Sequence, residues 1–149
     1  MNKKNRGFTL IELMVTIAVL GVITAMAAPS MGNILSKQKL NSTTREFIRT
    51  LTTAKTQAVL LRKEITVQLN STATDTQYIY NWQPSTGTAL TAPVSIPTII
   101  FTADGTLKNS NSGVFSSTSF IICNASANKS KTITLTRMGG ITLDGEGSC

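Results

Sequence analysis

An uninterrupted apolar segment with a single acidic residue lies near the N-terminus of the chain. From Phe8 to Ala28 the sequence contains no Lys, Arg or Asp, and Glu12 is its one charged residue. As a helix with a rise of 1.5 Å per residue, this segment would measure roughly 31 Å, enough to cross the hydrocarbon core of a bilayer. The segment therefore predicts a transmembrane helix.

Basic residues stand directly before this segment, at Lys3, Lys4 and Arg6. Positive charge beside the first span of a protein keeps that end of the chain in the cytoplasm. We therefore expect a single-pass protein of the inner membrane, with the residues after Ala28 exported to the periplasm.

Two conventional interpretations of the N-terminus remain open. A cleaved secretory signal also begins basic and turns apolar, and Ala25-Met26-Ala27 supplies a small-x-small cleavage site, but its apolar region runs only about 7 to 15 residues. A plain signal anchor fits the length but leaves Glu12 without a role. A carboxylate inside hydrocarbon costs several kcal/mol unless it is protonated or paired. A third interpretation must therefore account for the acid.

The stretch Gly7-Phe8-Thr9-Leu10-Ile11-Glu12-Leu13 closely resembles the type IV prepilin signature, which pilins share with type II secretion pseudopilins. In that family a membrane aspartyl peptidase cuts after the glycine and leaves the apolar segment on the mature protein. The resemblance implies a leader peptide at residues 1–7, cleavage after Gly7, and an N-methylated N-terminus at Phe8. It also implies that Glu12 is the acid of the motif, and that the partners are prepilin peptidase and other pilin or pseudopilin subunits.

The chemistry of such a cleavage gives Glu12 a role in assembly. Cleavage before Phe8 creates an amine within one helical turn of Glu12. Two staggered helices in an apolar filament core could pair the ammonium group of one with the carboxylate of the next. A buried ion pair adds little net stability but strongly disfavours wrong registers. We expect Glu12 to set the register of assembly, and the alternative is an acid tolerated near the membrane surface by protonation or snorkelling.

Helical patterning continues to about residue 63. Pro29 removes a backbone hydrogen bond and clashes with the preceding turn, so we expect a bend or a local unwinding between Ala27 and Gly32. Beyond Gly32, residues of one face recur at steps of four and three, which predicts an amphipathic helix over residues 29–63 that packs on a sheet. They are Leu40, Thr44, Phe47, Leu51, Ala54, Ala58 and Leu61.

Positive charge is concentrated on this second helical segment. Residues 29–64 contain seven basic residues against Glu46 and Glu64, a net charge of +5, whereas the charges from Ile65 onward sum to zero. The seven are Lys37, Lys39, Arg45, Arg49, Lys55, Arg62 and Lys63. Such a face can be simply solvated, or it can meet acidic neighbouring subunits, anionic lipid or the phosphates of DNA.

The rest of the chain is predicted to be rich in short strands. Runs of β-branched and aromatic residues lie at 64–69, 77–82, 95–101, 119–123, 131–136 and 141–143. The first two runs are predicted to form a hairpin, and Pro97 makes the third an edge strand or delays its start to Thr98. Segments 84–93 and 108–119 are interpreted as exposed loops. The predicted fold is α+β, with a long N-terminal helix packed on one small antiparallel β-rich head at residues 64–149.

The two cysteines of the chain, Cys123 and Cys149, are expected to form a disulfide because the head is exported. The bond would close a loop of about 26 residues and contribute about 3 kcal/mol in the chain-entropy model. A metal site is not expected, since the chain has no histidine and two thiolates leave a zinc shell incomplete. Without a histidine base, a carboxylate pair or a phosphate-binding glycine loop, we expect neither an enzyme nor a cofactor.

The chain resembles minor pilins and pseudopilins of the GspH/FimT type in its long helix and in two later stretches. These stretches are Phe101-Thr102-Ala103-Asp104-Gly105 and residues 133–140. The resemblance implies a subunit that primes or caps assembly of a type IV pilus or a type II secretion pseudopilus. The alternative is a pilus-associated DNA-uptake receptor of the FimT type.

The residues that could contact DNA in this alternative are Lys129, Lys131 and Arg137. Some DNA-binding FimT-like proteins carry an arginine-rich element after the late glycine. Here residues 139–143 contain no basic side chain and are followed by Asp144 and Glu146. DNA is therefore a possible partner that the sequence does not favour.

Overall fold

The structure, a computed structural model, describes residues 8–93, 95–96, 98–108 and 115–149, and for residues 26–30 it describes only the backbone. The predicted leader at residues 1–7 therefore lies outside the described residues, as do Pro97 and residues 109–114 of the loop predicted at 108–119. The chain divides into two compact units, Met1–Leu35 and Ser36–Cys149. We call them the N-terminal unit and the head unit and describe each by itself.

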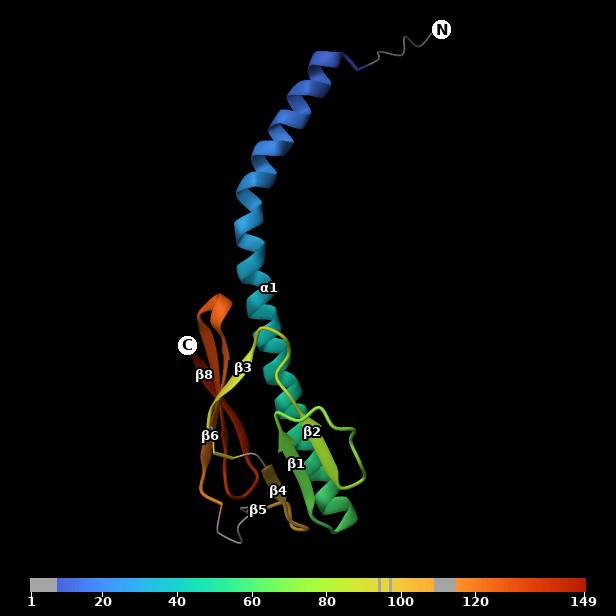
Figure 1. Cartoon of the computed structure of the whole chain (residues 1–149), viewed down its shortest axis with the longest axis vertical. Helices are drawn as coiled ribbons and strands as arrows, with labels where there is room; N and C mark the ends of the chain where they lie inside the picture. Colours follow the sequence, from blue (N-terminus) through green and yellow to red (C-terminus); the bar gives the residue numbers. More distant parts are fainter. Residues whose placement is uncertain (1–7, 94, 97, 109–114) are drawn as a thin grey trace, which may run out of the picture. The chain divides into compact units, whose positions relative to one another are not determined.

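One helix, α1, runs from Leu10 to Leu61 (Figure 1). The backbone amide of Glu12 donates to the side-chain oxygen of Thr9 at 3.3 Å, so Thr9 caps the start of the helix. The backbone is helical at every position from 27 to 32, and the local unwinding predicted there is absent. Pro29 removes only one backbone hydrogen bond, and the helix continues on both sides of it. The alternative, a bend, stays a prediction.

The N-terminal unit is apolar on its surface. In its described part no hydrophobic side chain is buried, and the first buried side chain of α1 is Leu40, in the head unit. Among the residues whose side chains are described, no helix combines the length and the apolar character needed to cross a membrane. The segment predicted to span the membrane, residues 8–28, includes three positions whose side chains fall outside that description.

The head unit contains two four-stranded sheets. The first sheet has the strand order β2-β1-β4-β5. Its strands are β1 (Ile65–Leu69), β2 (Ile79–Trp82), β4 (Thr98–Phe101) and β5 (Leu107–Lys108). β4 begins at Thr98, which confirms one of the two alternatives given for the third predicted strand. The other alternative, an edge strand, is wrong, because β4 is an inner strand of the sheet.

The hairpin predicted for β1 and β2 is wrong, because these strands are parallel, with Val67 opposite Tyr80. Residues 70–78 connect them, and at about 3.3 Å per residue this connection can reach back along a five-residue strand. The connection also covers the outer edge of β2. The Asn81 amide donates to Asp75 Oδ1 at 2.7 Å, and the Thr76 amide donates to the carbonyl of Ile79 at 2.8 Å. These bonds protect an edge that would otherwise be open to pairing.

The second sheet is antiparallel throughout and has the order β3-β6-β7-β8. Its strands are β3 (Ala89–Ala92), β6 (Thr118–Asn124), β7 (Lys129–Leu135) and β8 (Ile141–Gly147), with the short 3-10 helix η1 (Ala125–Ala127) between β6 and β7. β3 lies within the segment predicted as a loop, because its residues Ala-Leu-Thr-Ala carry little β signal. β8 extends four residues beyond its predicted end, through a glycine-containing stretch that pairs with β7.

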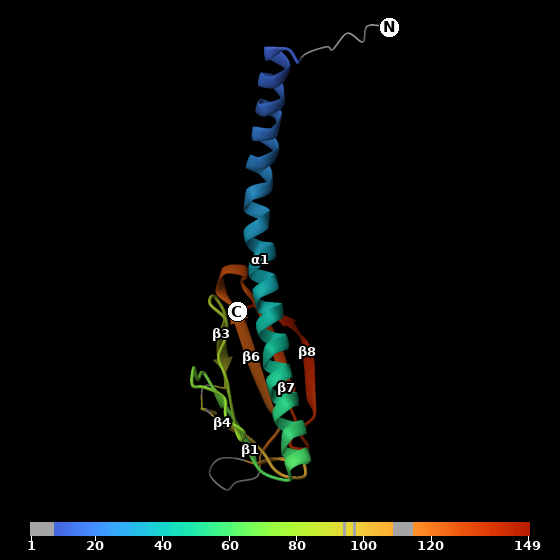
Figure 2. The same cartoon turned by 90° about the vertical axis from the view of Figure 1, so that its right-hand side faces the viewer.

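The core of the head unit lies between α1 and the two sheets. In Figure 2, β1, β3, β4 and β6 lie on one side of α1 and β8 lies on the other. Six of the seven residues predicted for the apolar face of the helix are buried, and Leu61, at the end of α1, is 37% exposed. Phe47 contacts both sheets: its ring centroid lies 4.5 Å from that of Trp82 on β2 and 5.4 Å from that of Phe120 on β6. The predicted packing of the helix on a sheet is therefore confirmed.

Candidate functional site

The first candidate site is the start of α1. Phe8 precedes the helix and is 77% exposed, and Glu12 lies in the first helical turn. Among the described residues, the Glu12 carboxylate has no ion pair and accepts no hydrogen bond. Its negative charge is favourable beside the positive end of the helix dipole. As far as the described residues go, this carboxylate is available for pairing, while Gly7 lies outside them.

The surface that surrounds Glu12 is apolar on all sides of the helix. Eleven large hydrophobic side chains between Phe8 and Ile23 are each 52% to 77% exposed. Full burial of one such side chain is worth about 1.5–3 kcal/mol. A helix that is apolar all round is stable only inside an apolar environment, which is either lipid or a packed assembly of helices.

The three basic residues proposed as DNA contacts are not brought together. Lys129 and Arg137 lie at or beyond opposite ends of β7, which is roughly 20 Å long at about 3.3 Å per residue. Lys131 lies between them, and its ammonium group pairs with the Glu146 carboxylate at 3.3 Å. The three side chains therefore form no common basic patch in this structure.

The predicted disulfide between Cys123 and Cys149 is present, with the two Cα atoms 5.7 Å apart. It joins β6 to the segment that follows β8. The Ser130 hydroxyl supports the same junction, because it donates to the carbonyl of Ser148 at 3.0 Å. The last residues are thus attached to the second sheet at two points.

Sequence reasoning missed a contact between the helix and two turns. Lys55 Nζ on α1 donates to the carbonyl of Gly139 at 2.8 Å and to that of Met138 at 3.3 Å. Gly139 in turn lies against Gly105, and a Cβ atom at Gly139 would be 2.4 Å from the Gly105 carbonyl oxygen. The two glycine turns were visible in the sequence, but nothing distinguished Lys55 from the other basic residues of the helix.

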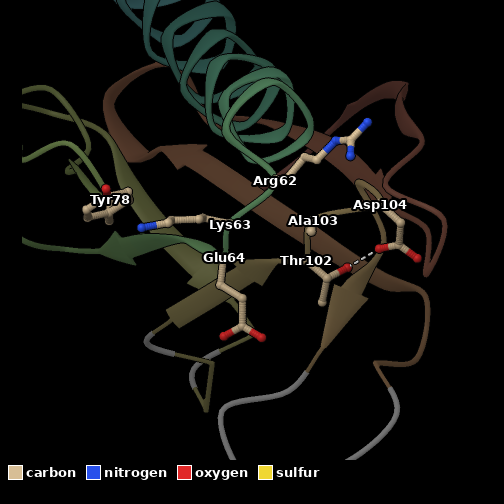
Figure 3. Close-up of a pocket in the computed structure, with 7 residues that line it drawn as sticks. All are labelled: Arg62, Lys63, Glu64, Tyr78, Thr102, Ala103 and Asp104. Carbon is tan, nitrogen blue, oxygen red and sulfur yellow. Dashed lines mark hydrogen bonds between the residues drawn. The ribbon is translucent and has the colours of Figure 1, made fainter.

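A recess of about 580 Å³ lies where α1 ends, and Figure 3 shows the side chains around it. It is bounded by the residues after the helix, by the segment before β2 and by the turn between β4 and β5. The lining residues are Arg62, Lys63, Glu64, Tyr78, Thr102, Ala103 and Asp104. Sequence reasoning could not find this site, because its walls come from three separate segments.

The charged groups of the recess differ in how they are engaged. Glu64 forms an ion pair with Lys108, and Lys63 Nζ lies 5.3 Å from the centroid of the Tyr78 ring. Hydrogen bonds from the Thr102 side chain and from Thr106 hold the pKa of Asp104 below its ordinary value. Asp104 is therefore ionised at neutral pH.

Two protein families match the chain. The family described as the prokaryotic N-terminal methylation motif matches residues 2–28, and the family described as type II transport protein GspH matches residues 43–139. The methylation motif implies processing by a prepilin peptidase and assembly with other pilin subunits.

In the described residues, no cluster of His, Cys, Asp or Glu side chains could hold a metal ion.

Individual relatives agree with these matches. A fimbrial protein of Pseudomonas aeruginosa is 36% identical over 84 residues, which are 56% of this chain and 53% of that protein. The type IV major pilin protein PilA of Myxococcus xanthus (strain DK1622) is 45% identical over 38 residues, 26% of this chain and 17% of that protein. The chain thus spans about half the length of the Pseudomonas relative that it matches.

A solved structure shows the same fold. The type IV minor pilin FimU of Pseudomonas aeruginosa (strain PAO1) superposes with a TM-score of 0.56 over 75% of this chain and 92% of that chain, at 19% sequence identity. At this identity the likeness concerns the fold, a long N-terminal helix packed on a β-sheet head. Because the GspH family matches more than half of the chain and the methylation motif precedes it, the chain belongs to the GspH family of type IV pilins and pseudopilins, which are structural proteins and not enzymes.

Proposed function

We propose that this protein is a minor pilin or pseudopilin that primes or caps assembly of a type IV pilus or a type II secretion pseudopilus. The observation that carries the proposal is the Glu12 carboxylate, which has no ion pair among the described residues and lies in a helical segment that is apolar on every side. Such a helix needs an apolar environment, and a packed bundle of similar helices supplies one. The head unit has its own core and does not use this surface.

The partner of Glu12 in the assembly is the new N-terminal ammonium group of a neighbouring subunit. No Lys or Arg lies between Gly7 and Ser36, so the apolar part of the helix offers no cation to a buried carboxylate. An unpaired buried carboxylate would cost several kcal/mol. Cleavage between Gly7 and Phe8 creates the missing cation, and Phe8 carries the methyl group added after cleavage.

Before assembly the same helix holds the subunit in a membrane. Membership of the pilin family implies a prepilin that is anchored in the inner membrane and then assembled into a pilus. In the proposed arrangement, Lys3, Lys4 and Arg6 stay on the cytoplasmic side until the peptidase removes them, and the head unit lies in the periplasm. The scattered positions of Lys129, Lys131 and Arg137 give the DNA-receptor alternative no support.

Incorporation into fibres tests the role of Glu12. The variant Glu12→Ala should be processed normally and found in the membrane fraction, but should be absent from the sheared-fibre fraction. Glu46→Ala, which removes an acid from the same helix within the head unit, is the matched control and should be incorporated like the unaltered protein. Incorporation of the Glu12 variant at the level of the Glu46 variant would refute the proposed role.

A further inference from the structure

The recess at the end of α1 lies at the pole of the head unit opposite the residue where the helix enters it. Ser36 and Leu61 are separated by roughly 38 Å along the helix axis, at 1.5 Å per residue. The recess is therefore far from the start of the head unit, and its volume of about 580 Å³ is in the range of pockets that bind small groups.

Arg62 is the first indication. Its φ angle is 51°, in the left-handed region, and the amide of Lys63 donates to the carbonyl of Ala58 at 3.2 Å. This is the Schellman end of a helix, where glycine is the preferred residue. Within the described ranges, the other non-glycine residues with positive φ are Asn70 and Asn128, and asparagine tolerates this conformation.

The arginine side chain is not used within the described part of the chain. Its guanidinium group forms no ion pair and donates no hydrogen bond there. In Figure 3 it extends from the end of the helix towards the side of the recess where Asp104 lies. An arginine at a glycine position thus disfavours folding and gains no compensating ion pair or hydrogen bond from the described residues. A partner in another molecule would supply one.

The balance of charge defines that partner. Among the lining residues, Arg62 and Lys63 are positive and Glu64 and Asp104 are negative. Lys108, which lies outside the lining, pairs with Glu64, so the five side chains together carry a net charge of +1. One carboxylate would neutralise this excess. A polyanion such as a nucleic acid would bring more charge and would meet the two carboxylates of the wall.

The apolar parts of the recess favour a peptide over an acidic sugar. Ala103, the Tyr78 ring and the aliphatic stems of Arg62 and Lys63 line it beside the charges. Lys63 already lies over the Tyr78 ring, so that face is not free to stack on a sugar. We propose that the recess binds one Asp or Glu side chain, with an adjacent apolar side chain, from an extended segment of a partner protein that meets this pole of the head unit.

Titration of the full chain in detergent micelles with a short acidic peptide tests the proposal. The probe is acetyl-Leu-Glu-Leu-amide, its neutral match is acetyl-Leu-Gln-Leu-amide, and the readout is the amide chemical shifts of Lys63, Tyr78 and Ala103. We expect saturable shifts with a Kd on the order of 1 mM for the acidic peptide and none for the neutral one. Sodium glucuronate tests for an acidic sugar and inorganic phosphate tests for a phosphate group. Both should bind more weakly than the acidic peptide.

Two variants of Arg62 separate binding from folding. Arg62→Gly suits the backbone conformation, so its Tm should be unchanged or higher, while its affinity for the acidic peptide should fall by roughly tenfold through loss of a charge-assisted hydrogen bond. Arg62→Gln should weaken binding to a similar degree. Arg49→Gln, which removes a guanidinium group elsewhere on the helix, is the matched control and should bind like the unaltered protein.

The proposal is overturned if the acidic peptide produces no saturable shifts, if the neutral peptide binds equally well, or if both Arg62 variants keep full affinity. Tighter binding of glucuronate or phosphate would overturn the assignment of a peptide partner. These outcomes are independent of cleavage after Gly7 and of the role of Glu12. Failure of the peptide-binding proposal would therefore leave the proposed assembly function untouched. Failure of the assembly function would likewise leave the peptide-binding proposal untouched.

Discussion

Lys55 Nζ lies 2.8 Å from the carbonyl oxygen of Gly139, a residue 84 positions later in the chain. Through this hydrogen bond the helix holds the turn between β7 and β8 against the turn between β4 and β5. The backbone amide of Leu107 also donates to the carbonyl of Arg137 at 2.9 Å, so the two sheets are joined at the same place. The two stretches that suggested the GspH/FimT resemblance therefore meet in space and stabilise the head unit together.

Removal of the Lys55 ammonium group should destabilise the head unit. Lys55→Met keeps the aliphatic stem and loses the hydrogen bonds to two carbonyls, which should lower the free energy of unfolding by about 1–3 kcal/mol. Urea unfolding of the full chain in detergent measures this. Lys39→Met, at an exposed position of the same helix, is the control, and equal stability of the two variants would rule out the role given to Lys55.

The close approach of Gly139 to Gly105 should make a methyl group at residue 139 costly. Gly139 has φ 70°, and an added Cβ would lie 2.4 Å from backbone. Gly87 has φ 89°, but a Cβ added there would meet nothing within 4 Å. Both alanine variants incur about 1 kcal/mol of backbone strain. Gly139→Ala should be the less stable in thermal unfolding, and similar Tm values would argue against the contact.

The structure agrees with the sequence for several features that a local pattern predicts, although the unwinding expected near Pro29 is absent. The steps of three and four identified the buried face of α1, because helix geometry alone decides which residues share a face. The cysteine pair was found because the chain has only two cysteines. The N-terminal motif is contiguous, so Gly7, Phe8 and Glu12 could be proposed directly from the sequence.

The features that the sequence did not reveal depend on long-range arrangement. The pairing of β1 with β2 is parallel because the connection folds back, and strand propensity carries no information about direction. β3 was missed because its pairing with β6, and not its own composition, makes it a strand. The contact of Lys55 and the recess at the end of α1 both require segments that only the folded chain brings together.

Reduction of the disulfide should destabilise the head unit. The bond between Cys123 and Cys149 spans 26 residues, and its loss should lower the free energy of unfolding by about 3 kcal/mol in the chain-entropy model. Urea unfolding with and without a thiol reductant measures the difference. In the double variant Cys123→Ala, Cys149→Ala the reductant should have no further effect, and an unchanged midpoint on reduction of the unaltered protein would contradict the prediction.

The pH dependence of stability should contain a contribution from Asp104. Its hydrogen bonds with Thr102 and Thr106 lower its pKa in the folded state below the ordinary value of 3.8. A depressed pKa contributes stability that is present above 3.8 and is lost as the pH falls through the lower folded-state value. The Tm of Asp104→Asn should therefore lie below that of the unaltered protein at pH 6, and the gap should shrink as the pH approaches 2. A Tm difference between the two proteins that does not change with pH would exclude a contribution of Asp104 ionisation to stability.

The mass of the N-terminal peptide of the mature protein, purified from membranes, tests the central claim most directly. That claim is that the apolar helix is retained after processing and serves as the assembly element. The account predicts a peptide that begins at Phe8 and carries one methyl group on its amine, and it predicts that Gly7→Asp leaves the leader attached. A mature protein that begins at Ala28, without the helix segment that contains Glu12, would contradict it.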